Sequence, residues 1–173
     1  MRMDKYSEKI INDIIGGKLM HLKSGRPFFS ESFDVSISHK DNITEVKMVL
    51  SPYRVGIDVE SLFPGIRAEL FLSSVIAREE IDLLNKFQLE NGCSLESAVA
   101  VFWSIKESFF KCLDYDLKPG KVRILDLSKN GKVRVILLPE IKNVMRRRKL
   151  ELFSTGWLIK GEYVYTETIM KAI

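Results

Sequence analysis

The apolar residues of this chain follow first a helical and then a strand period, and this order of elements occurs twice. Residues Tyr6 to Ile15 place isoleucines at helical spacing ahead of Gly16-Gly17, which predicts an amphipathic helix that ends there. The segment FDVSISH alternates apolar and polar residues, so it predicts a half-buried strand that Asp41-Asn42 turns into ITEVKMVL. After the turn residues Ser51-Pro52, RVGIDVE predicts a further strand. This part of the chain is therefore predicted as helix, hairpin, strand.

The second part repeats the order. Its helix is the long one predicted at Leu95 to Leu113, whereas Glu69 to Glu90, between the two parts, have helical spacing and lead into the loop LENGCS. The segment VRILDLSKNGKVRVILLP predicts a hairpin, because Asn130-Gly131 accepts the positive φ angles of a tight turn. Strands are expected at Leu150 to Ile159 and Tyr163 to Ile169. The predicted class is α+β, with two similar halves of one helix and an antiparallel sheet, at about 1–75 and 76–173, and a cleft between them.

Length and composition bound the possible classes of protein. The chain has 173 residues, 46% of them hydrophobic, which fits a single compact unit spanning 1–173. No run approaches the ~18 apolar residues of a membrane span, and charges interrupt the N-terminal segment, unlike in a signal peptide. We therefore expect a cytoplasmic protein without a membrane partner. Cys93 and Cys112 lie in unrelated contexts, so both are expected to be reduced, inert thiols.

The net charge of +4 is a mild basic excess, and its densest cluster is Arg146 to Lys149. Such a run is most often a solvated loop or the end of an element. A docking surface for an acidic protein is the second interpretation. Nucleic-acid binding is the third and weakest, because no aromatic residues that could stack on bases are interleaved with the basic ones.

The strand VGIDVE carries two carboxylates on one side. A period of two places Asp58 and Glu60 on the same face, about 7 Å apart. Like charges at this spacing repel each other unless water or a cation lies between them, and carboxylate oxygens are ligands that magnesium prefers. The alternative is an exposed strand end that happens to bear acidic residues.

The helix at Leu95 to Leu113 has a polar face of unusual composition. Trp103, Glu107 and Lys111 recur at i, i+4 and i+8. The core stripe of the same helix consists of Phe102, Ile105 and Phe109. An ordinary exposed pair of Glu107 and Lys111 would contribute only about 0.2–0.5 kcal/mol. The large Trp103 beside them favours a partly buried wall instead.

Ser38, His39 and Lys40 follow one another at the end of the predicted strand. A lone histidine at a strand end is more often structural or solvated. Together, however, the three side chains supply a hydroxyl and positive or switchable donors that suit phosphate oxygens.

Four motifs in order resemble one known family. The segments GRP, ISH, VGIDVE and WSIKESFFK, from Gly25 to Lys111, resemble the 4′-phosphopantetheinyl transferase superfamily, in its surfactin-synthetase-activating, pseudo-dimeric branch. The resemblance covers roughly half of the chain. It implies a fold of two halves related by pseudo-twofold symmetry. It also implies transfer of the phosphopantetheine arm of coenzyme A to a serine of an apo carrier protein, with release of 3′,5′-ADP and dependence on magnesium.

The resemblance also implies roles for individual residues. The expected magnesium ligands are Asp58, Glu60 and Glu107. The expected contacts to coenzyme A are Arg26, Ser38, His39, Lys106 and Lys111. Catalytic roles are expected for Asp58, Glu107 and Lys111, with Glu107 accepting the serine proton directly or through a metal-bound water.

The expected partner is an acidic carrier protein that bears a serine, from fatty acid, polyketide or nonribosomal peptide biosynthesis, and the expected state is a monomer. The alternative is a weak or inactive family member that binds coenzyme A or a carrier protein. Three departures from the family pattern support keeping this alternative. The N-terminal region is short, Lys40 replaces a small residue, and Arg26 replaces a lysine, which differs from arginine in geometry and hydration.

Overall fold

The computed structural model describes residues 9, 12–13, 16–22, 24–30, 32–62, 68–115 and 119–173. The helix expected from Tyr6 to Ile15 lies mostly outside the described residues, although the backbone is helical at Lys9, Asn12 and Asp13. In chain order the elements are β1 (Met20–His21), β2 (Pro27–Ser30), β3 (Phe33–Lys40), β4 (Ile43–Leu50), β5 (Tyr53–Ser61), α2 (Ala68–Val75), η1 (Arg78–Glu80), α3 (Ile81–Asn91), α4 (Leu95–Leu113), η2 (Pro119–Lys121), β6 (Val122–Leu127), β7 (Val133–Leu137), α5 (Pro139–Arg147), β8 (Leu150–Lys160) and β9 (Tyr163–Ala172).

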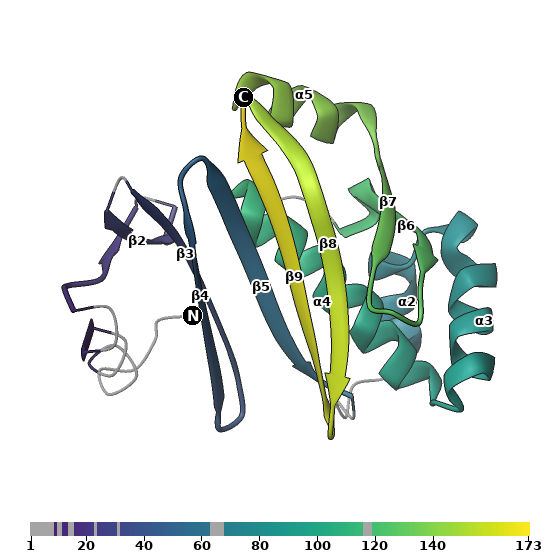
Figure 1. Cartoon of the computed structure of the whole chain (residues 1–173). Helices are drawn as coiled ribbons and strands as arrows, with labels where there is room; N and C mark the ends of the chain where they lie inside the picture. The colour runs from purple at the N-terminus through teal and green to yellow at the C-terminus, as the bar shows by residue number, and fades with distance from the viewer. Residues whose placement is uncertain are drawn as a thin grey trace.

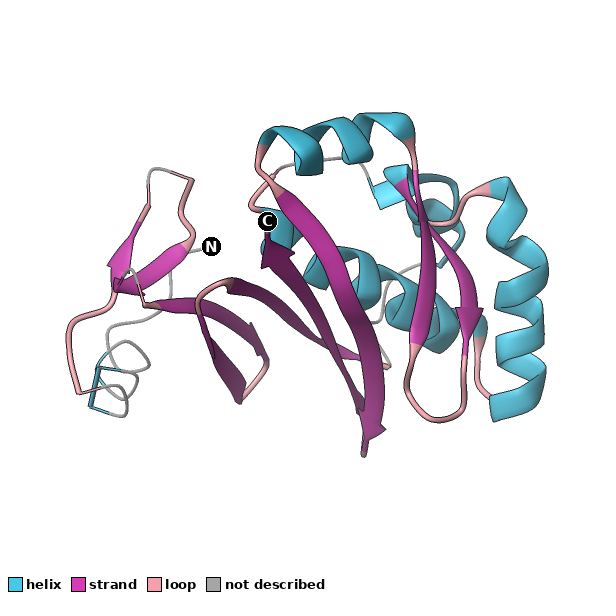
Figure 2. Ribbon diagram, turned by 45° about the horizontal axis from the view of Figure 1, so that its top comes forward, coloured by secondary structure: helices cyan, strands magenta, loops and turns pink. Residues whose placement is uncertain are grey.

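The strands form three antiparallel sheets (Figure 1). The first has the order β1-β2-β3-β4, the second β5-β9-β8, and the third is the β6-β7 hairpin. Helix α4 packs along one face of the second sheet, with α2 and α3 beside it, and α5 lies near the C-terminal end of β9. Figure 2 shows the first sheet on the side of the molecule away from α2 and α3. The α+β class expected from the sequence is confirmed.

Helix α4 is the centre of the core. It begins at the N-cap Ser94, whose hydroxyl accepts the N–H of Ser97, and it ends at Asp114, which has a left-handed backbone. Between Ser97 and Leu113 all of its residues are buried except Trp103, Glu107 and Lys111. The helical spacing therefore identified the one stripe of α4 that is not core.

A glycine allows α4 to lie directly on β5. A Cβ atom at Gly56 would come within 2.0 Å of the Ser108 carbonyl oxygen and 2.3 Å of the Cys112 nitrogen. Both are backbone atoms, so no side-chain movement could make room. This close approach brings Asp58, two residues along β5, within reach of side chains from α4.

The first two sheets are joined by side chains rather than by a backbone ladder. Alternate residues of β3 accept alternate backbone N–H groups of β5. The pairs are Asp34 with Val55 at 2.7 Å, Ser36 with Ile57 at 3.0 Å and Ser38 with Val59 at 3.1 Å. Because an unpaired strand edge exposes donors that need partners, these three side chains complete the edge of β5.

Most of the expected elements are confirmed. The hairpin β3-β4, the hairpin β6-β7, helix α4 and strands β5, β8 and β9 lie where the sequence predicts them. The single helix expected over Glu69 to Glu90 is wrong, since α2, η1 and α3 replace it. The break lets the Val75 carbonyl accept the Lys106 ammonium group, and the Glu80 carboxylate accept the Ala77 N–H.

Two further expectations bear on the site. The run Arg146 to Lys149, predicted foremost as a loop or the end of an element, lies at the C-terminal end of α5, a helix that the sequence pattern does not predict. Strand β5, from the expected first half, pairs along its length with β9, from the expected second half, so the two parts share one sheet.

Both cysteines are free thiols, as expected, and burial raises the pKa of Cys112 to about 12. No described helix is long and apolar enough to cross a membrane.

Candidate active site

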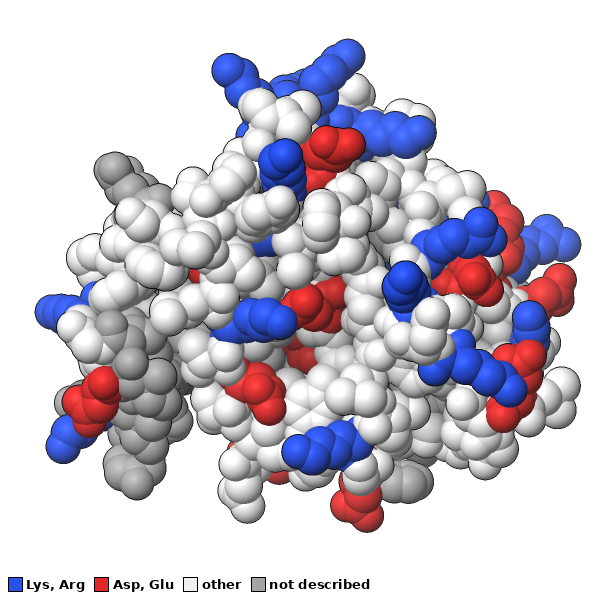
Figure 3. All heavy atoms as spheres, viewed as in Figure 1, with Lys and Arg blue, Asp and Glu red and all other residues white. Residues whose placement is uncertain are grey.

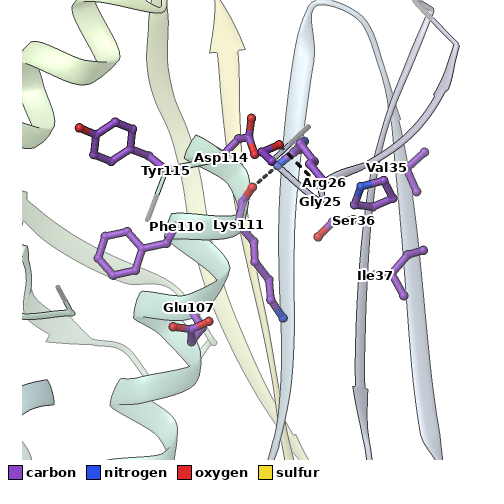
Figure 4. Close-up of a pocket in the computed structure, with 12 residues that line it drawn as sticks. Gly25, Arg26, Val35, Ser36, Ile37, Glu107, Phe110, Lys111, Asp114 and Tyr115 are labelled. Atoms are coloured by element: carbon purple, nitrogen blue, oxygen red, sulfur yellow. Dashed lines mark hydrogen bonds between the residues drawn. The ribbon is translucent and has the colours of Figure 1, made fainter. Parts of the chain in front are cut away.

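A cavity of about 490 Å³ lies between α4 and the strands β2 and β3 (Figure 4). Glu107, Phe110 and Lys111 line it from α4, and Asp114 and Tyr115 continue that wall. The opposite wall consists of residues 24–27 and 35–37. Two motifs that are far apart in the sequence, GRP and the helix motif, therefore face each other across one space of a size that suits a small-molecule ligand.

Lys111 connects the helix to the strands at this cavity. Its ammonium nitrogen lies 2.7 Å from Asp58 Oδ1 and donates to the Ser38 hydroxyl at 3.0 Å. Ser38 in turn donates to Asp58 Oδ1 at 3.1 Å. The hydroxyl of Ser38 is therefore fully used, whereas Lys111 has three donors and its side chain is 32% exposed. Lys111 can offer its third N–H to an anion in the cavity.

Asp58 has one oxygen that the protein does not satisfy. The residue is 7% exposed, and its Oδ2 atom is buried without a hydrogen-bond partner among the described residues. A buried carboxylate oxygen left in this state costs free energy, so it calls for a cation or a donor. A carboxylate oxygen without a partner is a ligand that suits a hard cation such as magnesium.

The other two expected metal ligands stand differently. Lys40, which follows the ISH motif, pairs with Glu60 at 2.5 Å, and the Ser61 N–H donates to the same carboxylate oxygen at 2.9 Å. Glu107 lines the cavity and is half-buried. Within the described ranges, no three acidic, histidine or cysteine side chains gather closely enough to hold a metal ion. The role of Asp58, Glu60 and Glu107 as one metal site stays a prediction.

Arg26 lines the cavity, but its guanidinium group donates hydrogen bonds to other protein atoms. Nη1 donates to the Lys111 carbonyl, and Nη2 donates to the Asp34 carboxylate and, at 2.9 Å, to the Val55 carbonyl. The residue is 8% exposed. Contact with coenzyme A, which the resemblance implied for Arg26, stays a prediction.

Lys106 points away from the cavity, and the structure does not support the expected contact with coenzyme A. Its side chain is fully buried, and its ammonium group lies 2.6 Å from both the Glu80 carboxylate and the Val75 carbonyl. Burial lowers the pKa of Lys106, although the nearby Glu80 carboxylate acts in the opposite direction. The physical reason is helical geometry: one step from Glu107 turns a side chain by about 100°.

His39 is half-buried on β3 and pairs across the hairpin with Thr44. Strand alternation turns its side chain to the face opposite Ser38, and it does not belong to the cavity lining. Its contact with coenzyme A also stays a prediction.

The basic end of α5 adjoins the cavity wall. Arg148 Nη1 donates to the Leu113 carbonyl at 2.7 Å, lies 3.6 Å from the Asp114 carboxylate, and its guanidinium carbon lies 5.7 Å from the centre of the Tyr115 ring. Asp114 and Tyr115 line the cavity. Figure 3 shows basic side chains gathered at the end of the molecule where α5 lies in Figure 1. The solvated-run interpretation is therefore incomplete, since Arg148 packs against the site.

Sequence reasoning missed three residues that shape this region. The sequence pattern gives Asp34 only as a polar strand position, Glu80 only as a residue within one helix, and Arg148 only as part of a charged run. The alternation in FDVSISH placed Asp34 on the same face as Ser38, so its position could have been noticed. Glu80 gave no signal, because its partner Lys106 lies 26 residues away in the sequence.

Solved structures of known proteins share the overall fold of this chain. The chain resembles in fold the holo-[acyl-carrier-protein] synthase of Neisseria meningitidis, with a TM-score of 0.54 and 16% identity over 68% of this chain and 97% of that one. The synthase of Plasmodium yoelii has a TM-score of 0.53 and 17% identity over 69% of this chain and 94% of that one. The synthase of Helicobacter pylori, solved in complex with coenzyme A, has a TM-score of 0.52 and 17% identity over 68% of this chain and 99% of that one. No curated protein sequence matches the chain significantly.

A family model also matches the sequence itself. The match spans residues 54–165, which is more than half of the chain, and it includes Asp58, Glu60, Glu107 and Lys111. Residues before Arg54, which carry Arg26 and Ser38, lie outside the match. On this evidence the chain belongs to the 4′-phosphopantetheinyl transferase superfamily.

Proposed function

We propose that this protein transfers the 4′-phosphopantetheine group of coenzyme A to a serine of an apo carrier protein and releases 3′,5′-ADP. The observation that carries the proposal is the cavity between α4 and β2-β3 in a member of this superfamily: Glu107 and Lys111 line it, and Lys111 also contacts Asp58 at 2.7 Å. Solved structures with the same fold include holo-acyl-carrier-protein synthases in complex with coenzyme A.

The reaction is one displacement at phosphorus. The serine hydroxyl oxygen attacks the phosphorus atom that carries the pantetheine arm, a new P–O bond forms, and the bond to 3′,5′-ADP breaks. Glu107 accepts the serine proton, and the leaving group keeps the electron pair and the negative charge. Lys111 donates to a phosphate oxygen with the N–H that Asp58 and Ser38 do not use.

Asp58 is the residue best suited to hold magnesium, because its Oδ2 atom is buried and unsatisfied. Glu107 and Glu60 are the proposed further ligands, and for Glu60 the ion pair with Lys40 has to open. A bound magnesium ion would neutralise charge on the diphosphate as the new bond forms.

One assay tests the proposal. Several apo carrier proteins, from fatty acid, polyketide and nonribosomal peptide synthesis, are incubated with coenzyme A, magnesium and this protein, and are then analysed by intact mass spectrometry. The expected result is a gain of the phosphopantetheine mass on one serine of at least one carrier. No gain on any carrier, together with coenzyme A binding by calorimetry, would favour the alternative of a binding protein without turnover.

Glu107→Gln separates proton acceptance from binding. Glutamine keeps the shape of the side chain and one oxygen but loses the charge and the basic oxygen. We expect kcat to fall by about 10²-fold while the KM for coenzyme A changes little. Steady-state transfer kinetics measure both constants. Equal losses in kcat and in coenzyme A affinity would show that Glu107 binds substrate and does not act as the base.

The basic end of α5 is the proposed docking surface for the carrier, because carrier proteins are expected to be acidic. Reversing Arg146, Arg147 and Lys149 to glutamate leaves Arg148 and its contacts in place. We expect the KM for the carrier to rise about tenfold at low salt, less at high salt, and more than the KM for coenzyme A. Lys129→Glu, at the exposed turn of the β6-β7 hairpin, is the control. Equal effects on both substrates would reject this surface.

We further propose that the protein acts as a monomer, whose single chain supplies both pseudo-symmetric halves of the fold of the surfactin-synthetase-activating branch. Analytical ultracentrifugation of the active protein tests this. A trimer with sites shared between chains would contradict it. The cytoplasmic location stays a prediction from the sequence.

A further inference from the structure

We propose that Arg26 is a positioning residue, which fixes the helix turn that carries Lys111 against the strand that carries Asp58. This inference rests on the proposed transferase function. It assigns Arg26 a different role from the direct coenzyme A contact that the resemblance implied. Figure 4 shows Arg26 reaching the backbone of Lys111 from the opposite wall of the cavity.

The contacts of Arg26 join two backbones that have no ladder between them. Nη1 donates to the carbonyl of Lys111 on α4, and Nη2 donates to the carbonyl of Val55 on β5 at 2.9 Å. Val55 lies three residues before Asp58 on the same strand. A single rigid guanidinium group thus sets the position of the end of α4 relative to β5.

This position matters because Lys111 lies in the last turn of α4. The Lys111 carbonyl accepts the Asp114 N–H of the helix cap at 3.3 Å, and a cation beside the last carbonyl groups is favoured by the helix dipole. The glycine contact at Gly56 determines how closely α4 approaches β5, and the Cys112 thiol donates to the Arg54 carbonyl of β5 at 3.4 Å. Arg26 adds a charged, bidentate restraint one residue from Cys112, where the Lys111 ammonium group lies 2.7 Å from Asp58.

Asp34 holds Arg26 in place. Its Oδ2 atom accepts from Arg26 Nη2 and, at 2.7 Å, from the Val55 N–H. The side chains of the pair are 6% and 20% exposed, so solvent competes little for these bonds. Arg26 and Asp34 therefore form one unit, and both lie outside the sequence region that matches the family model.

A double-mutant cycle tests the proposal. Arg26→Lys keeps the positive charge but loses the planar arrangement of donors. We expect it to lower kcat by about tenfold when Lys111 is present, because a small displacement of a reacting group is costly. In the Lys111→Ala background, the same change should alter kcat by less than about twofold. Equal losses in both backgrounds would overturn the proposal and indicate direct contact with coenzyme A. No loss in either would also overturn it.

Two controls keep the outcome readable. Arg54→Lys changes an arginine that shares a neighbouring cavity with Arg26 and that makes no side-chain hydrogen bond or ion pair in the described part of the chain. It should leave kcat unchanged. Asp34→Asn is the second variant, and it should reproduce the dependence on Lys111 because asparagine keeps an acceptor for Val55 but loses the charge. Circular dichroism checks that each variant is folded. If neither Arg26→Lys nor Asp34→Asn folds, the contacts of Arg26 maintain the whole fold and the positioning role is wrong.

Failure of the proposed function gives a different result. If the wild-type protein transfers nothing to any carrier, the cycle is repeated with the dissociation constant of coenzyme A measured by calorimetry. Arg26→Lys should then weaken binding only when Lys111 is present. Weakening by equal factors in both backgrounds, or no weakening, would overturn the positioning role on its own.

Discussion

Asp58→Ala is expected to lower phosphopantetheine transfer by at least about 10²-fold while the protein stays folded. The substitution removes the only buried side-chain oxygen of the site that the described part of the chain leaves without a partner, together with one anchor of Lys111. Loss of one preorganised charged group at a phosphoryl-transfer site commonly has an effect of this size. Transfer to the carrier is measured by mass spectrometry across a range of magnesium concentrations.

The fold should survive Asp58→Ala for a structural reason. Lys111 is partly exposed and keeps the Ser38 hydroxyl as a partner, so no buried charge is stranded. Asp58→Asn is the matched control, because it preserves volume and an acceptor for Lys111 while it removes the charge. We expect it to be nearly as inactive as the alanine variant. Near-normal, magnesium-dependent transfer by both variants, or unfolding of Asp58→Ala, would refute the assignment.

Glu80→Ala is expected to destabilise the protein by about 3–5 kcal/mol, the range found when one partner of a buried ion pair is removed. Glu80 is 1% exposed, and its carboxylate accepts from Lys106 at 2.6 Å, from the Ala77 N–H at 2.7 Å and from the Ile124 N–H at 2.6 Å. Removing it strands an ammonium group and two backbone donors in the core. Chemical denaturation, with the free energy of unfolding as the readout, measures the effect.

A surface pair in the neighbouring helix provides the comparison. Lys86 and Glu90 lie 3.8 Å apart on α3, with side chains 62% and 40% exposed. Glu90→Ala should cost less than about 0.5 kcal/mol, because solvent screens such pairs. If Glu80→Ala cost no more than Glu90→Ala, the buried pair would contribute little to the stability of the fold. The Lys106–Glu80 pair would then not be what holds the middle of α4 in place.

Local periodicity predicted the parts of the site that lie on single elements. A period of two placed Asp58 and Glu60 on one face of β5, and a spacing of four isolated Glu107 and Lys111 on the half-exposed stripe of α4. The same reasoning could not show which elements meet. The pairing of Glu60 with Lys40, and of Lys106 with Glu80, depends on tertiary packing that no spacing records.

The missed elements have physical explanations too. Helix α5 is short, with Pro139 at its start and Ile141 and Met145 as its buried residues, and its basic end masked that weak apolar stripe. The helix expected over Glu69 to Glu90 is interrupted at Ala77, which has an extended backbone, and Glu80 after this break contacts the distant Lys106. In both cases long-range contacts outweighed local preference.

The side-chain bonds between β3 and β5 make this junction separable from the two sheets that it joins. Each sheet keeps its own backbone ladder, whereas the amides of β5 that face β3 donate to the side chains of Asp34, Ser36 and Ser38. Local opening of the joint therefore exposes the amides of β5 that face β3 without unfolding either sheet, and amide hydrogen exchange there reports the event selectively. Ser38 also contacts Lys111, and Asp34 also contacts Arg26. Exchange of the same amides therefore also measures how often these contacts of the site open.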